Sequence, residues 1–259
     1  MPVVLHPVGS DRWPSNVRRN FCGSRRETQC DPGRDPFFKH AGFAENQCEL
    51  PLIRLYFQKR WMDGLGMRIL VIDGHPDRSE RHLCGAIADA YVEGAIRGGH
   101  LVRRIDLAVF NFPMLQSQKQ FENRQYPEEL GIAINDIQWS QHLVFIFPLW
   151  LGTMPALLKA FLEQVMRPGV AFEYADAGTG LKALLKGRSA RIIVTMGMPA
   201  ILYRLWFLNH GIATLRRGIL HMAGIRPVRQ SLFGGVEGVS DAKRKQWIAK
   251  VRRYGEMAR

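Results

Sequence analysis

The chain has 259 residues, of which 46% are hydrophobic and 23% are charged, and these ordinary globular values exclude a fully disordered, a collagen-like and a disulfide-scaffold protein. Lys and Arg outnumber Asp and Glu by 36 to 23, so the formal net charge is +13. Four Cys without C-x-x-C spacing indicate a reducing compartment, and the opening MPVVLHPVGS lacks a signal-peptide pattern, so we expect a cytoplasmic protein.

Residues 1–66 differ in pattern from residues 67–259. The first part has no sustained period of 2 or 3.6, and it contains many Arg, the breaker Asp31-Pro32-Gly33 and three of the four Cys. We expect it to be a poorly ordered or non-native extension; the alternative is a true extension that packs on the domain. An apolar run then starts at Met67, and the remainder has the length of one domain.

Strand and helix patterns alternate from Met67 onward. Short apolar or alternating runs predict strands at residues 67–73, 100–107, 142–149, 190–196 and 227–233. Apolar residues at helical spacing predict helices at 80–97, from Pro127, from Pro155, over 203–223, and after Ser240, which can cap the last one. A longer loop rich in Pro, Gln and Asn is expected at 108–126.

One apolar segment, residues 143–162, approaches the length of a membrane span and carries a single charge, Lys159. Pro148, Gly152 and Pro155 interrupt it, and its first half has strand composition while its second half has helical spacing. We therefore predict a buried strand, a tight loop and an amphipathic helix rather than a membrane-spanning helix.

Five strands that alternate with helices indicate βαβ units, hence a parallel sheet with helices on both faces. In such sheets the ligand binds beyond the carboxyl ends of the strands. The loops that follow the strands are therefore the segments in which functional residues are expected.

The loop after the first strand, GHPDRSERHL (74–83), leads into the start of a helix. Free backbone N–H groups and the helix dipole favour an anion at this position. Ser79 offers a hydroxyl, while His75, Arg78 and Arg81 offer donors or positive charge. An ordinary turn before a capped helix is the alternative interpretation.

The loop after the third strand, FPLWLGTMP (147–155), contains a Trp between a Pro and a Gly. A tight turn here would leave the N–H groups of residues 149–152 free to face a flat heteroaromatic ring, with Trp150 at the edge of that ring. The alternative is that Trp150 packs in the core.

The loop after the fourth strand, TMGMPAILYR (195–204), carries Gly197, which permits close backbone approach, and Tyr203, whose phenol can donate to a substrate oxygen. His210 follows; a surface or core histidine without a catalytic role is the alternative for it. The three loops together offer an anion site, a flat slot and two proton donors, a combination that suits a flavin nucleotide.

Residues 67–259 resemble the flavodoxin-like NAD(P)H dehydrogenase (quinone) family, which includes quinone reductases and modulator-of-drug-activity-like flavoproteins. The resemblance lies in ILVIDGHP (69–76), in the block FPLW…G.MPA.LK.F…V..PG.AF.Y (147–174), and in T.G.P…Y followed by HG (195–211). It implies a flavodoxin-like, doubly wound, five-stranded parallel sheet of order 2-1-3-4-5 with helices on both faces.

The resemblance also implies roles for individual residues. It assigns the flavin phosphate loop to His75, Ser79, Arg81, His82 and Leu83. It assigns the loop against the isoalloxazine ring to Pro148, Leu149, Trp150 and Leu151, and the third loop to Thr195 and Gly197. Tyr203 and His210 are then the catalytic pair that hydrogen-bonds the acceptor.

The implied activity is two-electron transfer from NADH or NADPH, through FAD or FMN, to a quinone or a similar small acceptor in ping-pong order. A homodimer whose site is completed across the interface is also implied. Two other classes stay open: a flavodoxin-type electron carrier, and a regulatory flavoprotein subunit of a membrane transporter.

The positive charge concentrates on the last helix, at Lys243, Arg244, Lys245, Lys250, Arg252 and Arg253. It can attract anionic nucleotides or give loose contact with an anionic membrane surface, and the alternative is a solvated helix face. No array of alternating aromatic and basic residues points to nucleic acid.

Overall fold

The computed structural model describes residues 66–123, 125–175 and 180–259. The chain divides into two units, Met1–Arg54 and Leu55–Arg259, and the description below concerns the second unit alone. The expectation for the extension at 1–66 falls, apart from Gly66, outside the described residues and stays a prediction.

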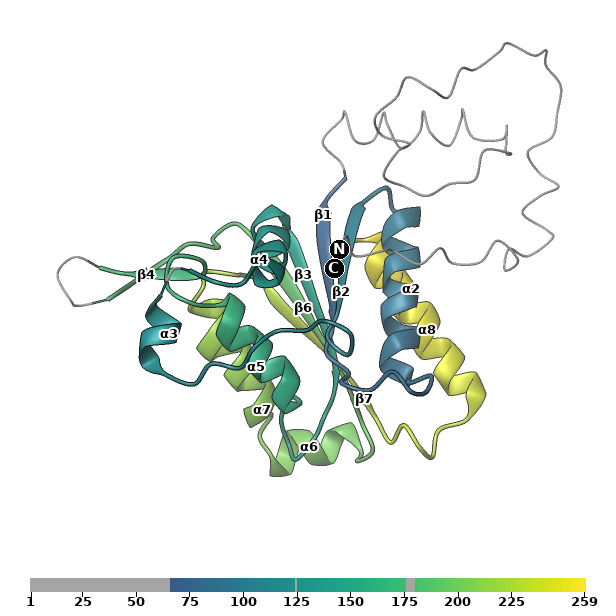
Figure 1. The fold of residues 1–259 in the computed structure, drawn as a ribbon. Coiled ribbons are helices and arrows are strands. Elements are labelled where there is room, and N and C mark those ends of the chain that lie inside the picture. Colours follow the sequence, from purple (N-terminus) through teal and green to yellow (C-terminus); the bar gives the residue numbers. More distant parts are fainter. Residues whose placement is uncertain (1–65, 124, 176–179) are drawn as a thin grey trace, which may run out of the picture. The chain divides into compact units, whose positions relative to one another are not determined.

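Five parallel strands form the main sheet (Figure 1): β1 (Arg68–Asp73), β2 (Leu101–Asp106), β3 (His142–Pro148), β6 (Ser189–Met196) and β7 (Val228–Gly234). Their order in space is β2-β1-β3-β6-β7. The three central strands are buried over nearly their whole length, as continuous apolar runs predict for a sheet covered on both faces. The predicted flavodoxin-like α/β architecture is confirmed at this level.

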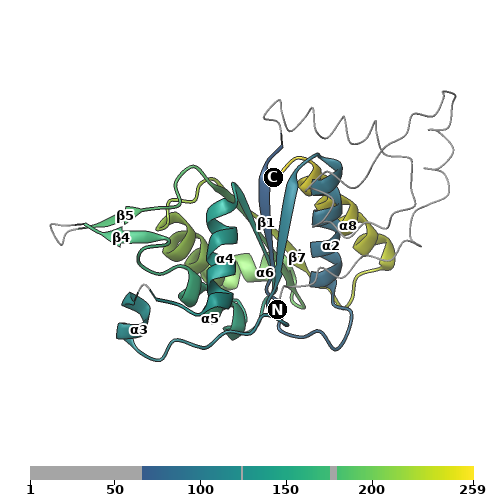
Figure 2. The same cartoon turned by 45° about the horizontal axis from the view of Figure 1, so that its top comes forward.

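The strand numbering needs a correction, because the chain contains a hairpin that the sequence analysis did not predict. β4 (Phe172–Tyr174) and β5 (Leu181–Ala183) follow β3 and precede β6 in the chain. They pair antiparallel with each other, outside the main sheet. The order 2-1-3-4-5 counted five strands, whereas the last two strands of the sheet are the sixth and seventh in the chain. Strands of three residues are too short for a periodicity to reveal them. The hairpin projects away from the sheet (Figure 2).

Helices cover both faces of the sheet (Figures 1 and 2). One face carries α2 (Leu83–Arg97) and α8 (Asp241–Glu256); the other carries α4 (Glu128–Trp139), α5 (Ala156–Val165), α6 (Ala200–Trp206), α7 (His210–Ala213) and the π-helical η2 (Thr214–His221). A short helix, α3 (Gln118–Glu122), lies in the loop expected at 108–126. Ser240 caps α8, since its side chain accepts from the N–H of Lys243.

The single helix predicted over 203–223 is divided in the structure. α6 ends at Trp206, and the next helix begins at His210. The two residues before it, Leu208 and Asn209, have φ angles of 48° and 56°, which lie in the left-handed region and stop a right-handed helix.

Two apolar cores flank the sheet because alternate strand residues point to opposite faces. Ile69, Val71, Val144 and Ile146 pack toward α2 and α8, whereas their neighbours along the strands pack toward α4 and α5. At Gly94 the backbones of α2 and α8 touch: a Cβ added there would lie 1.9 Å from the carbonyl oxygen of Arg252. Only glycine permits this approach.

Across the described ranges, none of the helices combines the length and the apolar character needed to cross a bilayer. The segment 143–162 forms β3, a turn and α5, as the sequence predicted.

Candidate functional site

The loops after β1, β3 and β6 meet at one edge of the sheet. Strand register places Asp73 beside Ile146 and Pro148 beside Thr195, so the carboxyl ends of the three strands are neighbours. The N–H of Leu149 donates to the carbonyl oxygen of Thr195 over 2.8 Å. The prediction that these loops share one edge is confirmed.

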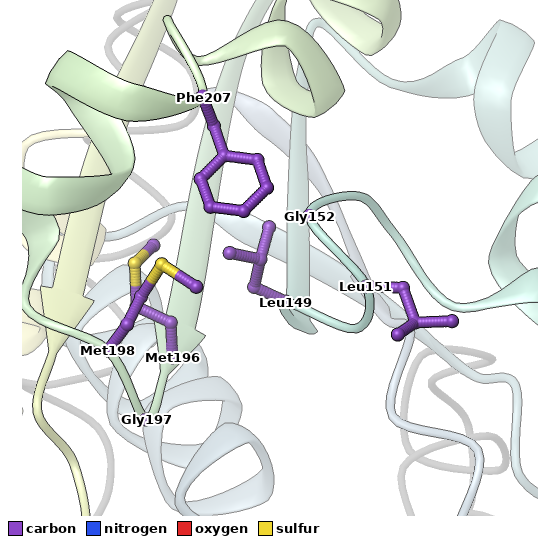
Figure 3. A pocket seen from close by; sticks show the side chains of 7 residues that line it. All are labelled: Leu149, Leu151, Gly152, Met196, Gly197, Met198 and Phe207. Atoms are coloured by element: carbon purple, nitrogen blue, oxygen red, sulfur yellow. The ribbon is translucent and has the colours of Figure 1, made fainter.

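A cavity of about 440 Å³ opens between the second and third loops. Its lining consists of Leu149, Leu151, Gly152, Met196, Gly197, Met198 and Phe207 (Figure 3). These side chains are aliphatic, thioether or aromatic, and the two glycines leave backbone exposed. The cavity is therefore suited to a flat, largely apolar ring with polar atoms at its edge.

The first loop ends at an open helix start. The N-cap residue of α2, His82, makes no side-chain capping bond, and the first turn contains no acidic residue. Among the described residues, no partner is found for the N–H groups of Leu83, Cys84 and Gly85. Arg81 is exposed at the same place, whereas Arg78 forms an ion pair with Asp106. The start of α2 is thus an anion-binding position.

Asp77 occupies part of the same loop, and the sequence analysis did not single it out. Its carboxylate accepts from the N–H of Ser79 over 2.7 Å and contacts Nε2 of His82 over 2.9 Å. These hydrogen bonds lower the pKa of Asp77 to about 2. Asp77 therefore engages both Ser79 and His82 in this arrangement, and their assignment to a phosphate stays a prediction.

The rings of His75 and His82 stack with centroids 3.8 Å apart. Partial burial, with the neighbouring His82 as the second cause, lowers the pKa of His75. Nδ1 of His75 also accepts from the N–H of Asp77 over 3.1 Å. His75, Asp77 and His82 thus form one connected cluster on the first loop.

Behind the first loop, Arg104 of β2 joins the strand ends. It donates to Asp73 over 3.1 Å, to Asp106 over 2.7 Å and to Asp89 of α2 over 2.5 Å. Asp73 is buried, and this burial raises its pKa. The ion pairs hold β1, β2 and α2 in register beneath the loop.

The second loop is a tight turn from Trp150 to Thr153. Each of these two residues donates its N–H to the carbonyl of the other, and Leu151 and Gly152 between them have φ angles of 48° and 81°. The predicted turn is present, but the N–H groups of Leu149 and Trp150 are already bonded. Within the described part of the chain, only those of Leu151 and Gly152 lack a partner among the four expected to be free.

Trp150 is 48% exposed, so the alternative of core packing is wrong. It does not line the first cavity but a second one of about 470 Å³, together with Lys159 and Thr214 among others. Its ring meets that of His75 edge-on at 6.1 Å, which places it between the first and second loops. Pro148, at the end of β3, is half-buried and pairs with Thr195 in the sheet.

In the third loop, Gly197 lines the cavity as expected, but Thr195 is buried. The Thr195 hydroxyl lies 3.2 Å from Sγ of Cys84, so it links β6 to the first turn of α2 rather than facing a ligand.

Tyr203 lies differently from its expected role. Its side chain is fully buried, and its hydroxyl donates to the carbonyl oxygen of Gly152 over 3.0 Å. Burial raises the pKa of this phenol, and the backbone N–H groups of Ile212 and Gly211 oppose the shift. In this arrangement the hydroxyl is already committed and cannot donate to an acceptor in the cavity.

His210 is the first residue of α7 and is exposed, so it is accessible to a bound molecule. Phe207 was not predicted as a site residue, although it lines the cavity. The sequence offered only a hint, since Phe207 lies between Tyr203 and His210.

The protein family described as "Flavodoxin-like fold" matches this chain over residues 67–256. An uncharacterized NAD(P)H oxidoreductase of Haemophilus influenzae is 29% identical over 70% of this chain and 91% of its own. NAD(P)H dehydrogenase [quinone] 1 of Cavia porcellus is 28% identical over 65% of this chain and 69% of its own. Among solved structures, the FMN-dependent NADH-azoreductase of Bacillus anthracis in complex with FMN is 19% identical, with a TM-score of 0.58 over 73% of this chain and 98% of its own.

Proposed function

This chain belongs to the flavodoxin-like fold family, and from that premise we propose that it is a flavin-dependent oxidoreductase that passes two electrons from NADH or NADPH to a quinone or a similar small acceptor. The observation that carries the proposal is the apolar cavity at the strand ends, beside the open N-terminus of α2. The names of the Haemophilus and Cavia relatives support this reaction class.

The residues present fit a flavin nucleotide. The first turn of α2 and the exposed Arg81 would hold its phosphate, and the cavity beside Gly197 would hold its ring. Bound there, the flavin supplies the two-electron chemistry. The B. anthracis protein of the same fold was solved with FMN, and we propose FMN or FAD for this chain.

The side chains around the cavity exclude water and position the reactants. Leu149, Met196 and Met198 form apolar walls, and the N–H groups of Leu151 and Gly152 stay available to the polar edge of a ring. We assign the hydrogen bond to the acceptor oxygen to His210, which is exposed. Tyr203 enters the proposal as a positioning residue that fixes the Gly152 carbonyl.

We further propose that donor and acceptor use the same cavity in turn.

We also propose that two copies of the chain associate over α6. Side chains of α6 beside the cavity are strongly exposed: Ile201 by 62%, Leu205 by 70% and Trp206 by 80%. Large apolar side chains exposed together on one short helix are typical of an interaction surface. Because NADH and NADPH are found inside cells, we propose that the protein is located in the cytoplasm.

A visible spectrum of the purified full-length chain tests the cofactor. We expect a yellow protein with flavin absorbance that bleaches under anaerobic NADH or NADPH and recovers on addition of menadione. A folded chain that binds neither FMN nor FAD would contradict the proposal. Reduction by dithionite but not by NAD(P)H would favour the electron carrier.

Sedimentation of the full-length chain tests the assembly. We expect a dimer that Trp206→Asp dissociates. A monomer that instead binds vesicles of anionic lipid would favour the membrane-surface contact. Co-purification with a transporter would favour the regulatory subunit.

A further inference from the structure

One long stretch of the chain carries positive charge without negative charge. Residues 177–236 contain no Asp or Glu, although they contain many Lys and Arg. Lys186 and Arg188 of this stretch precede β6, and Arg226 precedes β7. Arg68 is the first residue of β1. Because these strands are parallel, the four residues lie at the amino edge of the sheet, opposite the edge that carries the cavity.

Hydrogen bonds hold the arginines of this edge close together. Nε of Arg68 donates to the carbonyl of Trp139 over 2.6 Å, and a terminal nitrogen of Arg188 donates to that of Gln138 over 2.6 Å. The two carbonyls belong to consecutive residues at the end of α4. The carbonyl of Arg188 accepts from the N–H of Arg226 over 2.8 Å. Burial, and then the charge of Arg68, lower the pKa of Arg188, in agreement with this proximity.

The π-helix η2 brings two further arginines to the same region. π-Helical segments are rare and occur frequently at functional sites. Their hydrogen bonds join residues five apart, so Arg216 and Arg217 lie about one turn before His221. Burial lowers the pKa of His221, and the charges of Arg226, Arg216 and Arg217 lower it further. η2 therefore extends the positive charge that begins at the strand ends.

Lys186 lies against the segment that joins η2 to β7. At Gly224 an added Cβ would lie 2.8 Å from the Lys186 side chain. We refer to the basic residues of this region as the amino-edge cluster, which consists of Arg68, Lys186, Arg188, Arg216, Arg217 and Arg226.

The charges of the amino-edge cluster are not neutralised by carboxylates in the described ranges. None of its six side chains forms an ion pair there. Basic residues elsewhere do find partners, as Arg103 does with Asp136 and Arg252 does with Glu93. Nε of Arg188 and Nε of Arg216 also lack a hydrogen-bond partner among the described residues. Like charges that repel one another without compensation are typical of a surface that binds an anion.

We propose that the amino-edge cluster binds the phosphate groups of anionic phospholipids at a membrane surface. Five of its six members are arginines, and the planar guanidinium group matches the geometry of a phosphate. Each basic residue close to an anionic lipid surface strengthens binding about fivefold. The inference goes beyond the proposed redox activity and does not rest on it.

Two observations favour a lipid surface over nucleic acid and over a ligand at the cavity. The exposed aromatic residues of the described ranges are Tyr126, Trp150, Tyr174 and Trp206, and none of them belongs to η2 or adjoins a cluster residue in the chain. Single-stranded nucleic acid is bound largely by stacking on such residues. In addition, a membrane bound at the amino edge leaves the cavity at the carboxyl edge open to solvent.

Cosedimentation of the full-length chain with lipid vesicles tests the proposal. We expect the wild-type protein to pellet with vesicles of mixed phosphatidylcholine and phosphatidylglycerol, and to stay in solution with vesicles of phosphatidylcholine alone. Binding weakens as the salt concentration rises, because exposed charges are screened. The assay needs no flavin, so its failure is distinguishable from failure of the proposed function.

Arg217→Gln combined with Arg226→Gln removes two exposed charges of the cluster. We expect the dissociation constant for the anionic vesicles to rise at least about tenfold. Circular dichroism checks the fold of this double variant. If it does not fold, Lys186→Gln combined with Arg217→Gln, also at exposed positions, takes its place.

Lys245→Gln combined with Arg253→Gln is the matched control. Both residues are exposed on α8, the helix at which the sequence suggested membrane contact, and the change in net charge is the same. We expect the dissociation constant to change less than about twofold, because these charges lie outside the cluster. The flavin-loaded protein should also reduce menadione at an unchanged rate when it is bound to vesicles.

Wild-type protein that ignores anionic vesicles overturns the inference. Equal weakening by the two double variants also overturns it, because binding would then follow net charge rather than this cluster. Loss of menadione reduction on vesicles would place the lipid at the cavity instead, and tighter binding to duplex RNA than to vesicles would assign the cluster to nucleic acid; either result contradicts the proposal.

Discussion

The hydroxyl of Tyr203 donates to the carbonyl oxygen of Gly152 over 3.0 Å, and this bond joins the loop after β6 to the turn after β3. Both loops line the cavity, so the shape of the cavity depends on this hydrogen bond within the protein. Gly152 is partly buried, and leaving its carbonyl without a donor costs stability, so the relationship is open to a direct test.

Tyr203→Phe removes this bond while keeping the ring that packs on Phe207. We expect the free energy of unfolding to fall by about 1 kcal/mol, measured by urea denaturation, because the Gly152 carbonyl is left unpaired. Turnover falls and flavin stays bound. Tyr174→Phe is the control, since Tyr174 is 59% exposed. Wild-type stability and turnover in Tyr203→Phe would contradict the positioning role.

Asp77→Asn removes a carboxylate from the first loop while keeping a side chain of similar size. The carboxylate holds the N–H of Ser79 and the ring of His82, both of which can serve a phosphate. We expect the affinity for FMN to rise about two- to fivefold, measured by flavin fluorescence, because a competing negative charge is gone. Weaker binding in the variant would indicate that Asp77 instead orients His82 for the cofactor.

His142 makes stability depend on pH below neutrality. Burial, reinforced by the nearby Arg191 and Arg229, lowers its pKa from 6.5 to about 3. The unfolded chain therefore takes up a proton that the folded chain does not, so this stability is complete above pH 6.5 and is lost as the pH falls toward 3. We expect the free energy of unfolding, measured by urea denaturation, to fall across this range by up to about 1.4 kcal/mol per pH unit.

In His142→Gln, the free energy of unfolding should depend less steeply on pH, because up to one fewer proton is taken up on unfolding. The control His210→Gln, at an exposed position, should keep the wild-type slope. Equal slopes in His142→Gln and the wild-type protein would show that His142 is not the group responsible.

Cys84 should resist alkylation in the folded protein. Burial raises the pKa of its thiol from 9.0 to about 12, against the opposing hydrogen bond with Thr195. Because the thiolate is the nucleophile, we expect iodoacetamide at pH 8 to modify Cys84 at least about a hundredfold more slowly than in guanidinium-unfolded protein. Peptide mass spectrometry measures both rates on the same residue. Similar rates would mean that the start of α2 opens readily.

The architecture could be predicted because its strands have strong patterns. The run LVFIF in β3, which follows His142, is continuously apolar, and such a run is typical of a strand covered on both faces. Once the strands are parallel, their carboxyl ends share an edge, so the meeting of the three loops follows from chain order alone. β4 and β5, of three residues each, carry no such pattern.

The roles of individual side chains were harder to predict, because they depend on tertiary direction. Tyr203 was expected to face an acceptor, but the position of α6 turns it inward toward Gly152. Asp77 was passed over because a carboxylate does not suggest an anion site, yet it binds the donors of that loop. The sequence does not mark Phe207 as a site residue, because it does not show that the chain turns at the left-handed Leu208 and Asn209.

The glycine contact between α2 and α8 affects the position of the opposite, N-terminal end of α2. Gly94 lies against Arg252, and Gly255 lies against Tyr91, so the rear half of α2 rests directly on the backbone of the last helix. The front of α2 is the end that would receive a phosphate. The position of that end thus depends on residues near position 255, because even an alanine side chain at Gly94 or Gly255 would force the two helix backbones apart.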